Sequence, residues 1–387
     1  MLDHKNKDQS TQRQLRVLLV GPSLKDVGGV ANYLNILQKN IDRNQVALFY
    51  VPVGRSSPQS LLWCRPIDYL NSVYRFLKSL FRNHYDLIQL NPSFTKRSLP
   101  LNMLLLIIAK VFSQVPVIIF FHGWDNQMGC ILAENRMISV LLKQILKRAD
   151  FYMVLSRSFR EVFIKAGFAS DRIKVFSLMV DISAFNDSGE DFMPNNDQNR
   201  PFKVLFLSRI ERDKGVRTLS EAIRWIHQNH PEVPIEFNIA GSGLEEEFIK
   251  TSLRQEISDG LVKMPGYLIG IEKVKAYQTA DLYVFPSFHE GFPTTILEAM
   301  AAGLPLIYTP VGALKEVLGP ENGICIQLDN LSGVSLGIAI LTLCQDVDRR
   351  MAMSQVNQKL VKERYDIKSA CSNVVDIYKE LLGVGLI

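Results

Sequence analysis

Short apolar runs alternate with longer amphipathic segments along nearly the whole chain, and this alternation limits the folds open to it. The runs are LRVLLV, QVALFYV, DLIQL, VPVIIFF and FYMVL in the first half, then FKVLFLS, IEFNIAG, LYVFPS and LPLIYT in the second. Each run has the length of one β-strand, and each intervening segment has room for a helix. Such alternation indicates βαβ units, in which helices cover both faces of a parallel sheet. The sequence therefore predicts an α/β fold with doubly wound sheets.

One polar stretch interrupts the alternation. Residues 184–201, AFNDSGEDFMPNNDQNRP, lack periodicity and are rich in Asp, Asn and Pro. We interpret them as a linker between an N-terminal Rossmann-like domain, residues 15–183, and a C-terminal one, residues 202–365, because 387 residues suffice for two hydrophobic cores. Residues 1–14 are predicted to be disordered. Residues 366–387 are predicted to form a C-terminal helix that can pack back on the N-terminal domain.

Two segments bear on the location of the protein. Residues 1–14 are polar and lack the apolar core of a secretory signal peptide, so we expect a cytoplasmic protein. The five cysteines are scattered without CxxC spacing, which is typical of reduced thiols. Residues 100–121 form a long apolar run, but polar residues and Pro116 interrupt it. A helix to about Ser113 followed by a buried strand explains this run better than a membrane span does.

Positive charge is concentrated in the first half of the chain. Residues 1–200 contain 25 Lys and Arg against 16 Asp and Glu, whereas the remainder contains 19 against 23. Two predicted helices of the first half carry basic stripes opposite their apolar faces. The stripes consist of Arg75, Lys78 and Arg82, and of Arg136, Lys143 and Lys147. A solvated face is one interpretation; the other is peripheral binding to an anionic membrane, on its cytoplasmic side. A nucleic acid partner is not expected.

Several candidate residues lie where predicted strands end, which is where doubly wound sheets bind ligands. Gly28 and Gly29 precede a helix whose first N–H groups could bind an anion, although a tight turn without a ligand explains them equally well. Arg209 and Lys214 follow a strand and could neutralise a diphosphate, or could be solvated. Gly241 would allow backbone to approach a ligand, or mark a plain turn.

The segment FHEGFPTTILEAMAAGLPLI contains two glutamates, Glu290 and Glu298, separated by seven residues. They could be an acid/base pair or could grip a substrate, or Glu298 could form a capping box with Thr295. Free amides near Thr294 and Thr295 would face the cleft. His122 follows an apolar strand and would also face the cleft, or be a structural histidine; no metal-ligand spacing surrounds it.

Taken together, these segments resemble the retaining glycosyltransferases of family 4, which have the GT-B fold. The resemblance rests on SRIERDKGV, IAGSGLEEE, the early GGV loop and GYLIGIEKVKAYQTADLYVFPSFHEGFPTTILEAMAAGLPLI. It spans essentially the whole chain and is strongest from Phe202 to about Asn330. It implies two Rossmann-like domains that face each other across a cleft.

The resemblance also implies roles for individual residues. Glu290 and His122 would be catalytic, with Glu290 contacting hydroxyls of the donor sugar and His122 lying near the transferred sugar. Glu298 would hold the ribose hydroxyls, and the backbone near Tyr267 would frame the base. The amides of the turn between the glutamates would bind sugar and phosphate; these residues are Phe292, Pro293, Thr294 and Thr295.

For the diphosphate, the resemblance implies that Arg209 and Lys214 hold it while the Gly28 and Gly29 loop approaches from the first domain. Fixed cations and a helix start can stabilise a departing diphosphate, so neither a metal nor a cofactor is expected. The predicted activity is retaining transfer of a hexosyl group from a nucleotide diphosphate sugar, a UDP-sugar by preference. The acceptor would be lipid-linked or a saccharide, in surface polysaccharide or glycoconjugate biosynthesis. The alternative is a catalytically silent GT-B subunit that stabilises a partner transferase.

Overall fold

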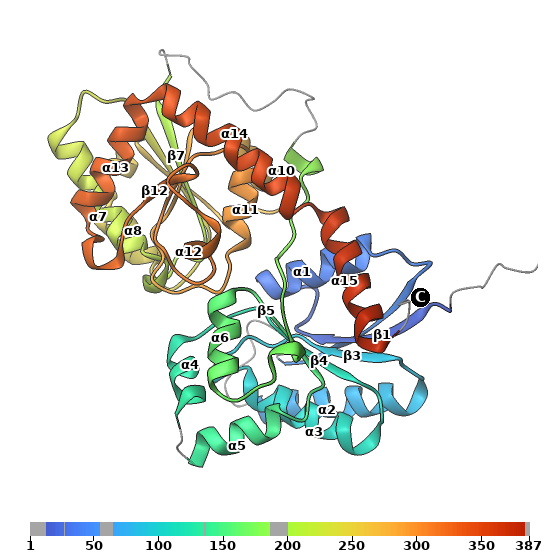
Figure 1. The fold of residues 1–387 in the computed structure, drawn as a ribbon. Coiled ribbons are helices and arrows are strands. Elements are labelled where there is room, and N and C mark those ends of the chain that lie inside the picture. Colours follow the sequence, from blue (N-terminus) through green and yellow to red (C-terminus); the bar gives the residue numbers. More distant parts are fainter. Residues whose placement is uncertain (1–12, 27, 55–64, 135–136, 186–199, 384–387) are drawn as a thin grey trace, which may run out of the picture.

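The computed structural model describes residues 13–26, 28–54, 65–134, 137–185 and 200–383. Two α/β domains are stacked one above the other and connected at one side (Figure 1). Each domain contains a six-stranded parallel sheet flanked by helices, which confirms the predicted fold class. Almost all of the predicted disordered N-terminus and of the predicted linker lies outside the described residues.

The N-terminal domain is a doubly wound sheet with strand order β2-β1-β3-β4-β5-β6. Helices α2, α3 and α5 lie along one side of this sheet, and α1 and α15 along the other (Figure 1). Because β4 is buried along its whole length, it is a continuous apolar run rather than an alternating one; β3 is also fully buried but contains the polar Gln89. The elements are β1 (Leu15–Gly21), α1 (Gly29–Asn40), β2 (Val46–Pro52), α2 (Arg65–Arg82), β3 (Leu87–Leu90), α3 (Leu99–Phe112), β4 (Val117–Phe121), α4 (Asn126–Ala133), α5 (Met137–Leu146), β5 (Phe151–Val154), α6 (Arg157–Lys165) and β6 (Ile173–Val175).

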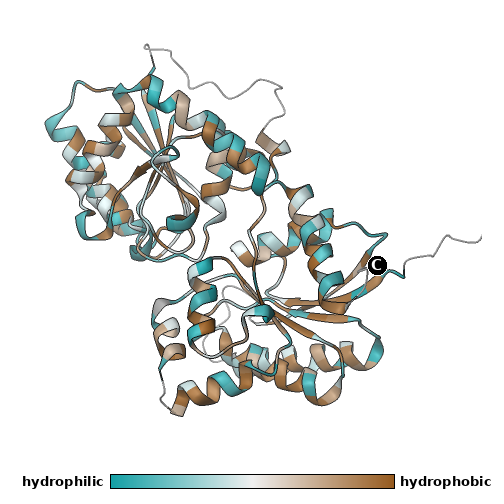
Figure 2. Ribbon diagram, viewed as in Figure 1, coloured by the Kyte–Doolittle hydropathy of each residue, from teal (hydrophilic) through white to brown (hydrophobic). Residues whose placement is uncertain are grey.

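The C-terminal domain has the order β12-β11-β10-β7-β8-β9, in which the direction of winding reverses between β7 and β10. Its strands are the most apolar ribbons of the domain and lie inside the helical layers (Figure 2). The strands are β7 (Phe202–Leu207), β8 (Ile235–Ala240), β9 (Val262–Gly266), β10 (Leu282–Phe285), β11 (Leu306–Tyr308) and β12 (Gly323–Cys325). The helices are α7 (Val216–Asn229), α8 (Glu246–Ser252), α9 (Arg254–Ser258), α10 (Gly270–Gln278), α11 (Thr294–Ala301), α12 (Leu314–Val317), α13 (Gly333–Gln345) and α14 (Val347–Arg364).

The chain returns to the N-terminal domain in its last helix, α15 (Ile367–Leu382). The Val180 amide donates to the carbonyl of Tyr365 just before this helix (3.0 Å). Helix α15 packs on α1, and its Tyr378 hydroxyl donates to Gln89 of β3 (2.6 Å), deep in the core. The C-terminal helix therefore completes the N-terminal domain.

The apolar run at residues 100–121 forms α3 followed by β4, as the sequence predicts. Within the described ranges, none of the helices combines the length and apolarity that crossing a membrane requires. The helix ends because Pro116 and the polar residues before it break the run, and the strand is then buried in the middle of the sheet.

Candidate active site

A cleft of about 1200 Å³ separates the two sheets, and both domains line it. It lies beyond the carboxyl ends of the strands, at the points where each sheet reverses its direction of winding, between β1 and β3 and between β7 and β10. Loops diverge at such points and leave room for a ligand. The candidate residues from sequence that line this cleft are Gly28, Gly29, His122, Arg209, Lys214, Gly241, Tyr267, Glu290, Phe292, Pro293, Thr294 and Thr295. The cleft thus gathers every candidate except Glu298, which lies just behind its wall.

Lys214 and Glu290 form an ion pair at the base of the cleft. The Lys214 ammonium donates to Glu290 Oε1 (2.6 Å) and to the carbonyl of His289 (3.3 Å). Both side chains are largely buried, with 7% and 17% of their surface exposed. Arg209 is different, because its side chain is 57% exposed and donates to Glu211 (2.5 Å). Both cations therefore pair with a carboxylate, but Lys214 is held in a buried site whereas the exposed Arg209 side chain can move toward a ligand.

Two glycines shape the loops that hold these cations. Gly215, directly after Lys214, has φ 73°, and a Cβ there would lie 1.9 Å from the carbonyl oxygen of Pro286. Gly241 has φ 140°, and its Cβ would lie 1.8 Å from the carbonyl oxygen of Ser208. Only glycine fits both positions. The close approach that Gly241 permits is therefore to the neighbouring loop, in addition to any ligand in the cleft.

The turn after β10 brings the two domains into contact. A Cβ at Gly291 would lie 3.0 Å from the carbonyl oxygen of His122, which belongs to the opposite domain. The loops that carry Glu290 and His122 therefore meet across the cleft. Sequence places both residues at strand ends, but only the tertiary fold shows that they are neighbours.

Helix α11 begins at the cleft without a side-chain cap. Its N-cap is Pro293, and among the described residues no side chain bonds to its first amides. Pro293 is among the residues predicted to bind the ligand through their amides, but it has no N–H and cannot donate. The backbone donors there are Phe292, Thr294 and Thr295. The Phe292 side chain is buried and packs edge-on against Tyr365, with ring centroids 5.6 Å apart. Only the backbone of this residue can reach a ligand.

The alternative in which Thr295 and Glu298 form a capping box is wrong, because the N-cap of α11 is Pro293. Glu298 is buried, and it accepts from Lys273 Nζ at Oε1 (2.5 Å) and from the Tyr277 hydroxyl at Oε2 (3.0 Å). These partners hold the carboxylate away from the helix start. Burial, reinforced by the Glu298 charge, raises the pKa of Tyr277 well above its ordinary value, so this tyrosine stays a neutral donor. Sequence reasoning missed Lys273 and Tyr277, although they lie i and i+4 on one helix face.

His122 is buried and uncharged. Burial lowers the pKa of His122 to about 3, so the imidazole is neutral at physiological pH. Its Nε2 lies 3.1 Å from Asn91 Oδ1. The Asn91 amide nitrogen donates to the carbonyls of Val20 (3.1 Å) and Gln89 (3.2 Å), so its oxygen faces the histidine. Nε2 therefore carries the proton, and Nδ1 is left as an acceptor.

A chain of buried hydrogen bonds continues behind this histidine. Gln89 Nε2 donates to Asn91 Oδ1 (2.8 Å), and the Tyr378 hydroxyl donates to Gln89 Oε1 (2.6 Å). The C-terminal helix is thus linked to the cleft through two amide side chains. Sequence reasoning missed these residues because they are polar positions inside or facing an apolar strand, with no motif of their own.

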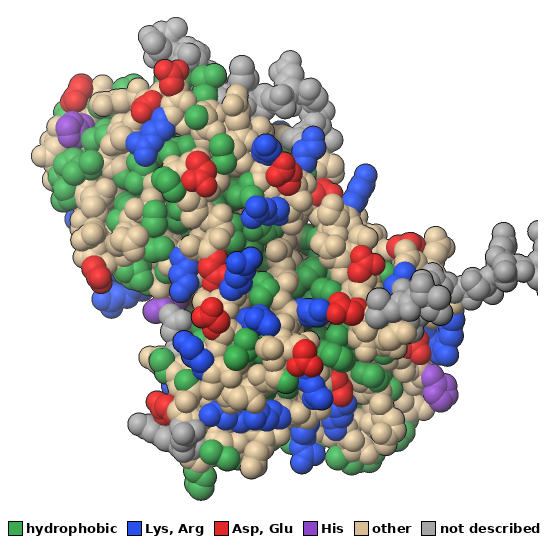
Figure 3. All heavy atoms as spheres, in the orientation of Figure 1, with side chains coloured by type: hydrophobic (Ala, Val, Ile, Leu, Met, Phe, Trp, Pro, Cys, Tyr) green, Lys and Arg blue, Asp and Glu red, His purple; other side chains and the backbone are tan. Residues whose placement is uncertain are grey.

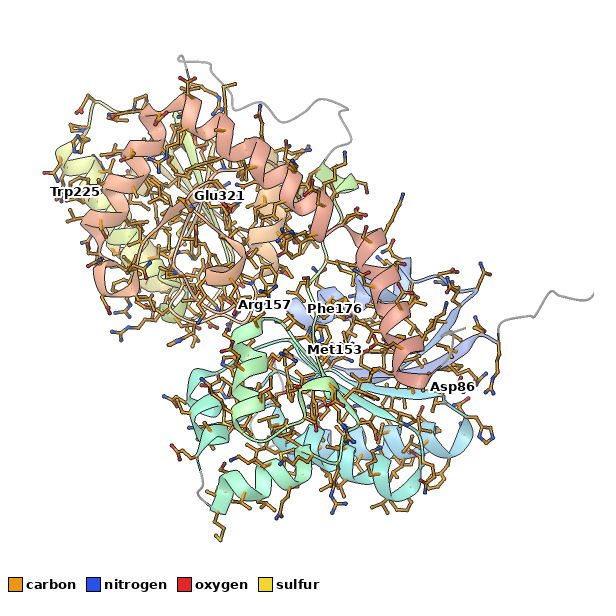
Figure 4. All side chains as sticks on the ribbon, in the orientation of Figure 1. Asp86, Met153, Arg157, Phe176, Trp225 and Glu321 are labelled. Carbon is orange, nitrogen blue, oxygen red and sulfur yellow. The ribbon has the colours of Figure 1, made fainter. Side chains whose placement is uncertain are left out.

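A second contact joins the domains at the edge of the cleft. Glu316 of α12 accepts from the backbone amides of Arg157 and Ser158, each at 2.8 Å, at the start of α6. Arg157 lies at the junction between the two domains (Figure 4). Burial opposes ionisation of Glu316, but the hydrogen bonds from Ser158 and Arg157 outweigh it and hold the pKa of Glu316 below its ordinary value. The C-terminal domain therefore supplies a cap to a helix of the N-terminal domain.

Across the described part of the chain, His, Cys, Asp and Glu side chains form no group of three or more that could hold a metal ion. Asp346 joins α13 to α14 and caps α14 through the amide of Arg349 (2.9 Å), and Asp348 lies in the first turn of α14. The charged side chains that line the cleft are mostly cations: Lys96, Arg97, Arg209, Lys214 and Lys273, together with Asp26, Asp68 and Glu290.

Comparison with known proteins gives two family matches. The profile described as Glycosyltransferase Family 4 matches residues 27–184, and the profile described as Glycosyl transferases group 1 matches residues 201–346. The two matches correspond to the two domains, and together they cover most of the chain.

Similar curated proteins are also glycosyltransferases. An uncharacterized glycosyltransferase of Methanocaldococcus jannaschii is 30% identical over 184 residues, which is 46% of each chain. The putative colanic acid biosynthesis glycosyltransferase WcaL of Escherichia coli is 25% identical over 204 residues, 51% of this chain and 48% of that one. The matched part spans about half the length of these curated relatives.

Solved structures share the whole architecture. Anabaena HepE in complex with UDP and glucose has a TM-score of 0.68 at 20% identity and covers 95% of this chain and 100% of its own. Sucrose-phosphate synthase from Thermosynechococcus elongatus has a TM-score of 0.73 at 17% identity and covers 96% of this chain and 100% of its own. At these identities the likeness shows the fold.

Proposed function

Because the chain belongs to the family 4, group 1 glycosyltransferases, we propose that it is a retaining, metal-independent hexosyltransferase that uses a UDP-sugar. The acceptor is a lipid-linked or saccharide molecule in surface polysaccharide or glycoconjugate biosynthesis. The observation that carries the proposal is the arrangement of the cleft. A buried cation, an uncapped helix start and a neutral histidine converge there from both domains.

The diphosphate would lie between Lys214 and the start of α11. Lys214 supplies one fixed positive charge, and exposed Arg209 can add a second. The free amides of Thr294 and Thr295 supply the partial positive charge of a helix N-terminus. These groups are oriented before the reaction, so they can stabilise the charge that develops on the leaving diphosphate.

The remaining residues would hold the nucleoside and the sugar. Glu298 would accept the two ribose hydroxyls, since Lys273 and Tyr277 fix its carboxylate just behind the cleft wall. Half-exposed Tyr267 would frame the base. Glu290 and His122 would flank the transferred sugar, because their loops meet across the cleft. The Gly28 and Gly29 loop would approach the diphosphate from the N-terminal domain.

The similar proteins support the donor and the pathway class. Structures of Anabaena HepE contain UDP, UDP-glucose, or UDP with glucose. A further neighbour is the lipopolysaccharide outer core galactosyltransferase WaaB. Two relatives are named for colanic acid and amylovoran biosynthesis. A UDP-sugar donor and an acceptor of surface polysaccharide biosynthesis, lipid-linked or saccharide, are therefore the expectation for this chain, at the inner face of the cell membrane.

Donor binding and turnover test the proposal in one sequence of experiments. Thermal-shift screening against UDP, GDP and ADP sugars should give the largest stabilisation with a UDP-sugar, because a ligand that binds the native state raises its apparent stability. The selected donor should then be hydrolysed slowly or transferred, and Glu290→Ala should abolish this turnover. Stabilisation by no donor, or turnover unchanged in Glu290→Ala, would contradict the proposal; the former result would favour a catalytically silent subunit.

A further inference from the structure

Helices α2, α3 and α5 of the N-terminal domain expose large apolar side chains to solvent. The most exposed are Leu70 and Phe81 on α2, each 69%, and Met137 and Ile138 on α5, 85% and 73%. Helix α3 contacts both neighbours, and the rings of Phe81 and Phe112 lie edge to face with centroids 5.8 Å apart. Soluble surfaces rarely carry so many adjacent apolar side chains without a partner. We call this surface the α2–α3–α5 face; its ribbons are largely apolar (Figure 2).

The exposed charges on the helices of this face have one sign, although Lys110 of α3 pairs with Asp150, whose side chain is 37% exposed. The sequences of α2, α3 and α5 contain a single acidic residue, Asp68, and it is buried. Lys78 and Arg82 of α2 are exposed, and so is Lys147 just after α5. In the space-filling view, apolar side chains reach the lower edge of this domain with Lys and Arg side chains above them (Figure 3). An apolar surface edged by cations matches the chemistry of an anionic membrane interface.

The remaining members of the predicted basic stripes contribute less. Arg75 and Lys143 are only partly exposed, and Lys143 donates to the carbonyl of Glu134 (2.9 Å). Arg136 lies outside the described residues. Charge alone is therefore a modest attraction, and the apolar side chains must supply much of the affinity.

We infer that the α2–α3–α5 face is a membrane-docking surface that inserts its apolar side chains among the headgroups of an anionic bilayer. A second copy of the chain fits this face less well. A symmetric dimer would set the same cations against one another, with no exposed acid on the described parts of these helices to pair with them.

The α2–α3–α5 face lies next to the cleft. Tyr69 of α2 and Pro100 and Leu101 of α3 line the cleft, so these two helices begin at its wall and extend along the face. A docked protein would therefore place the N-terminal side of the cleft beside the bilayer surface. This step rests on the lipid-linked acceptor of the proposed function; docking itself does not.

Vesicle flotation without donor or acceptor tests the docking independently of catalysis. The vesicles are phosphatidylcholine alone or with about 30% phosphatidylglycerol, at low salt and at about 0.5 M salt. The test variant is Leu70→Ser/Met137→Ser/Ile138→Ser. The matched control, Val334→Ser/Ile338→Ser, removes apolar side chains that are 46% and 52% exposed on α13 of the other domain. Thermal melting verifies that each variant is folded, and Leu70→Ser alone replaces the triple variant if that one unfolds.

The wild type should float with the anionic vesicles and keep part of its binding at high salt, because apolar insertion is not screened. The triple variant should bind about tenfold more weakly or worse, and the control should match the wild type. Equal binding by the triple variant and the wild type would overturn the inference. Absence of vesicle binding by the wild type would also overturn it. One such case is a wild type that is dimeric while the triple variant is monomeric, since the face would then be a dimer interface. If the wild type fails to bind vesicles but still transfers sugar, the docking inference is wrong and the proposed transferase activity stands.

Discussion

Lys214→Met tests whether the buried Lys214 ammonium binds the donor diphosphate or only neutralises Glu290. In the free protein the Lys214 ammonium is 2.6 Å from Glu290, and both side chains are largely buried. Removing one member of a buried pair leaves the other charge uncompensated and typically costs about 3–5 kcal/mol of unfolding free energy. We expect Lys214→Met and Glu290→Gln each to lower the stability by an amount toward the lower end of this range. The double variant should recover most of it, since neither charge then remains.

Affinity for UDP should follow a different pattern from stability. If Lys214 binds the diphosphate, its loss removes one charge-assisted hydrogen bond, which is worth about 1.5–3 kcal/mol. The Kd for UDP should then rise roughly 10- to 150-fold in Lys214→Met and equally in the double variant. Glu290→Gln should bind UDP as tightly as the wild type or more tightly, because the Glu290 carboxylate competes with the diphosphate for the ammonium.

Urea unfolding without ligand and isothermal titration with UDP measure the two quantities separately. The reasoning is refuted if Glu290→Gln weakens UDP binding as much as Lys214→Met does. It is also refuted if the double variant regains wild-type affinity, since Lys214 would then serve only as the partner of Glu290.

Three further predictions concern positions around the cleft. Glu316→Ala should lower the melting temperature at neutral pH. Calorimetry should show the difference between variant and wild type vanish as the pH falls through the depressed pKa of Glu316, because the wild-type carboxyl is then protonated and loses its charge. A difference in melting temperature that does not change with pH would contradict this. Asn91→Asp should raise the pKa of His122 above about 3, since a carboxylate beside Nε2 favours the imidazolium; an NMR titration in which the histidine stays neutral as in the wild type would disprove it. Gly215→Ala and Gly260→Ala should each lower the free energy of unfolding by about 1–2 kcal/mol, because both positions have positive φ. Gly215→Ala should cost at least about 1 kcal/mol more, because its Cβ alone of the two meets a carbonyl oxygen. Equal losses of stability in urea unfolding would refute the clash at Gly215.

The alternation of strands and helices could be predicted from the sequence because it depends on local periodicity. The run at residues 100–121 shows this well, since its polar interruptions place the helix and the strand where the structure has them. Parallel strands also bring their carboxyl ends to one edge of a sheet. Residues as far apart as Arg209 and Glu290 could therefore be assigned to one cleft without coordinates.

Local reasoning failed where distant residues compete for the same group. Thr295 and Glu298 have the spacing of a capping box, yet the carboxylate bonds to Lys273 and Tyr277, 25 and 21 residues away. Two hydrogen bonds from side-chain donors in a buried site stabilise the carboxylate more than a single bond from a backbone amide at a partly exposed helix start does. The spacing rule does not include those donors, so it could not predict the outcome.

By itself, the sequence determined the α/β fold with its two sheets, and many of the residues that reach the cleft, because periodicity and strand ends are properties of short segments. Only the tertiary structure decided how those residues pair. Lys214 meets Glu290 across 76 residues, and Tyr378 reaches Gln89 across 289. The tertiary structure also decided that the apolar sides of α2, α3 and α5 stay partly uncovered. Pairing and exposure depend on which surfaces the folded chain brings together, and no local pattern contains that information.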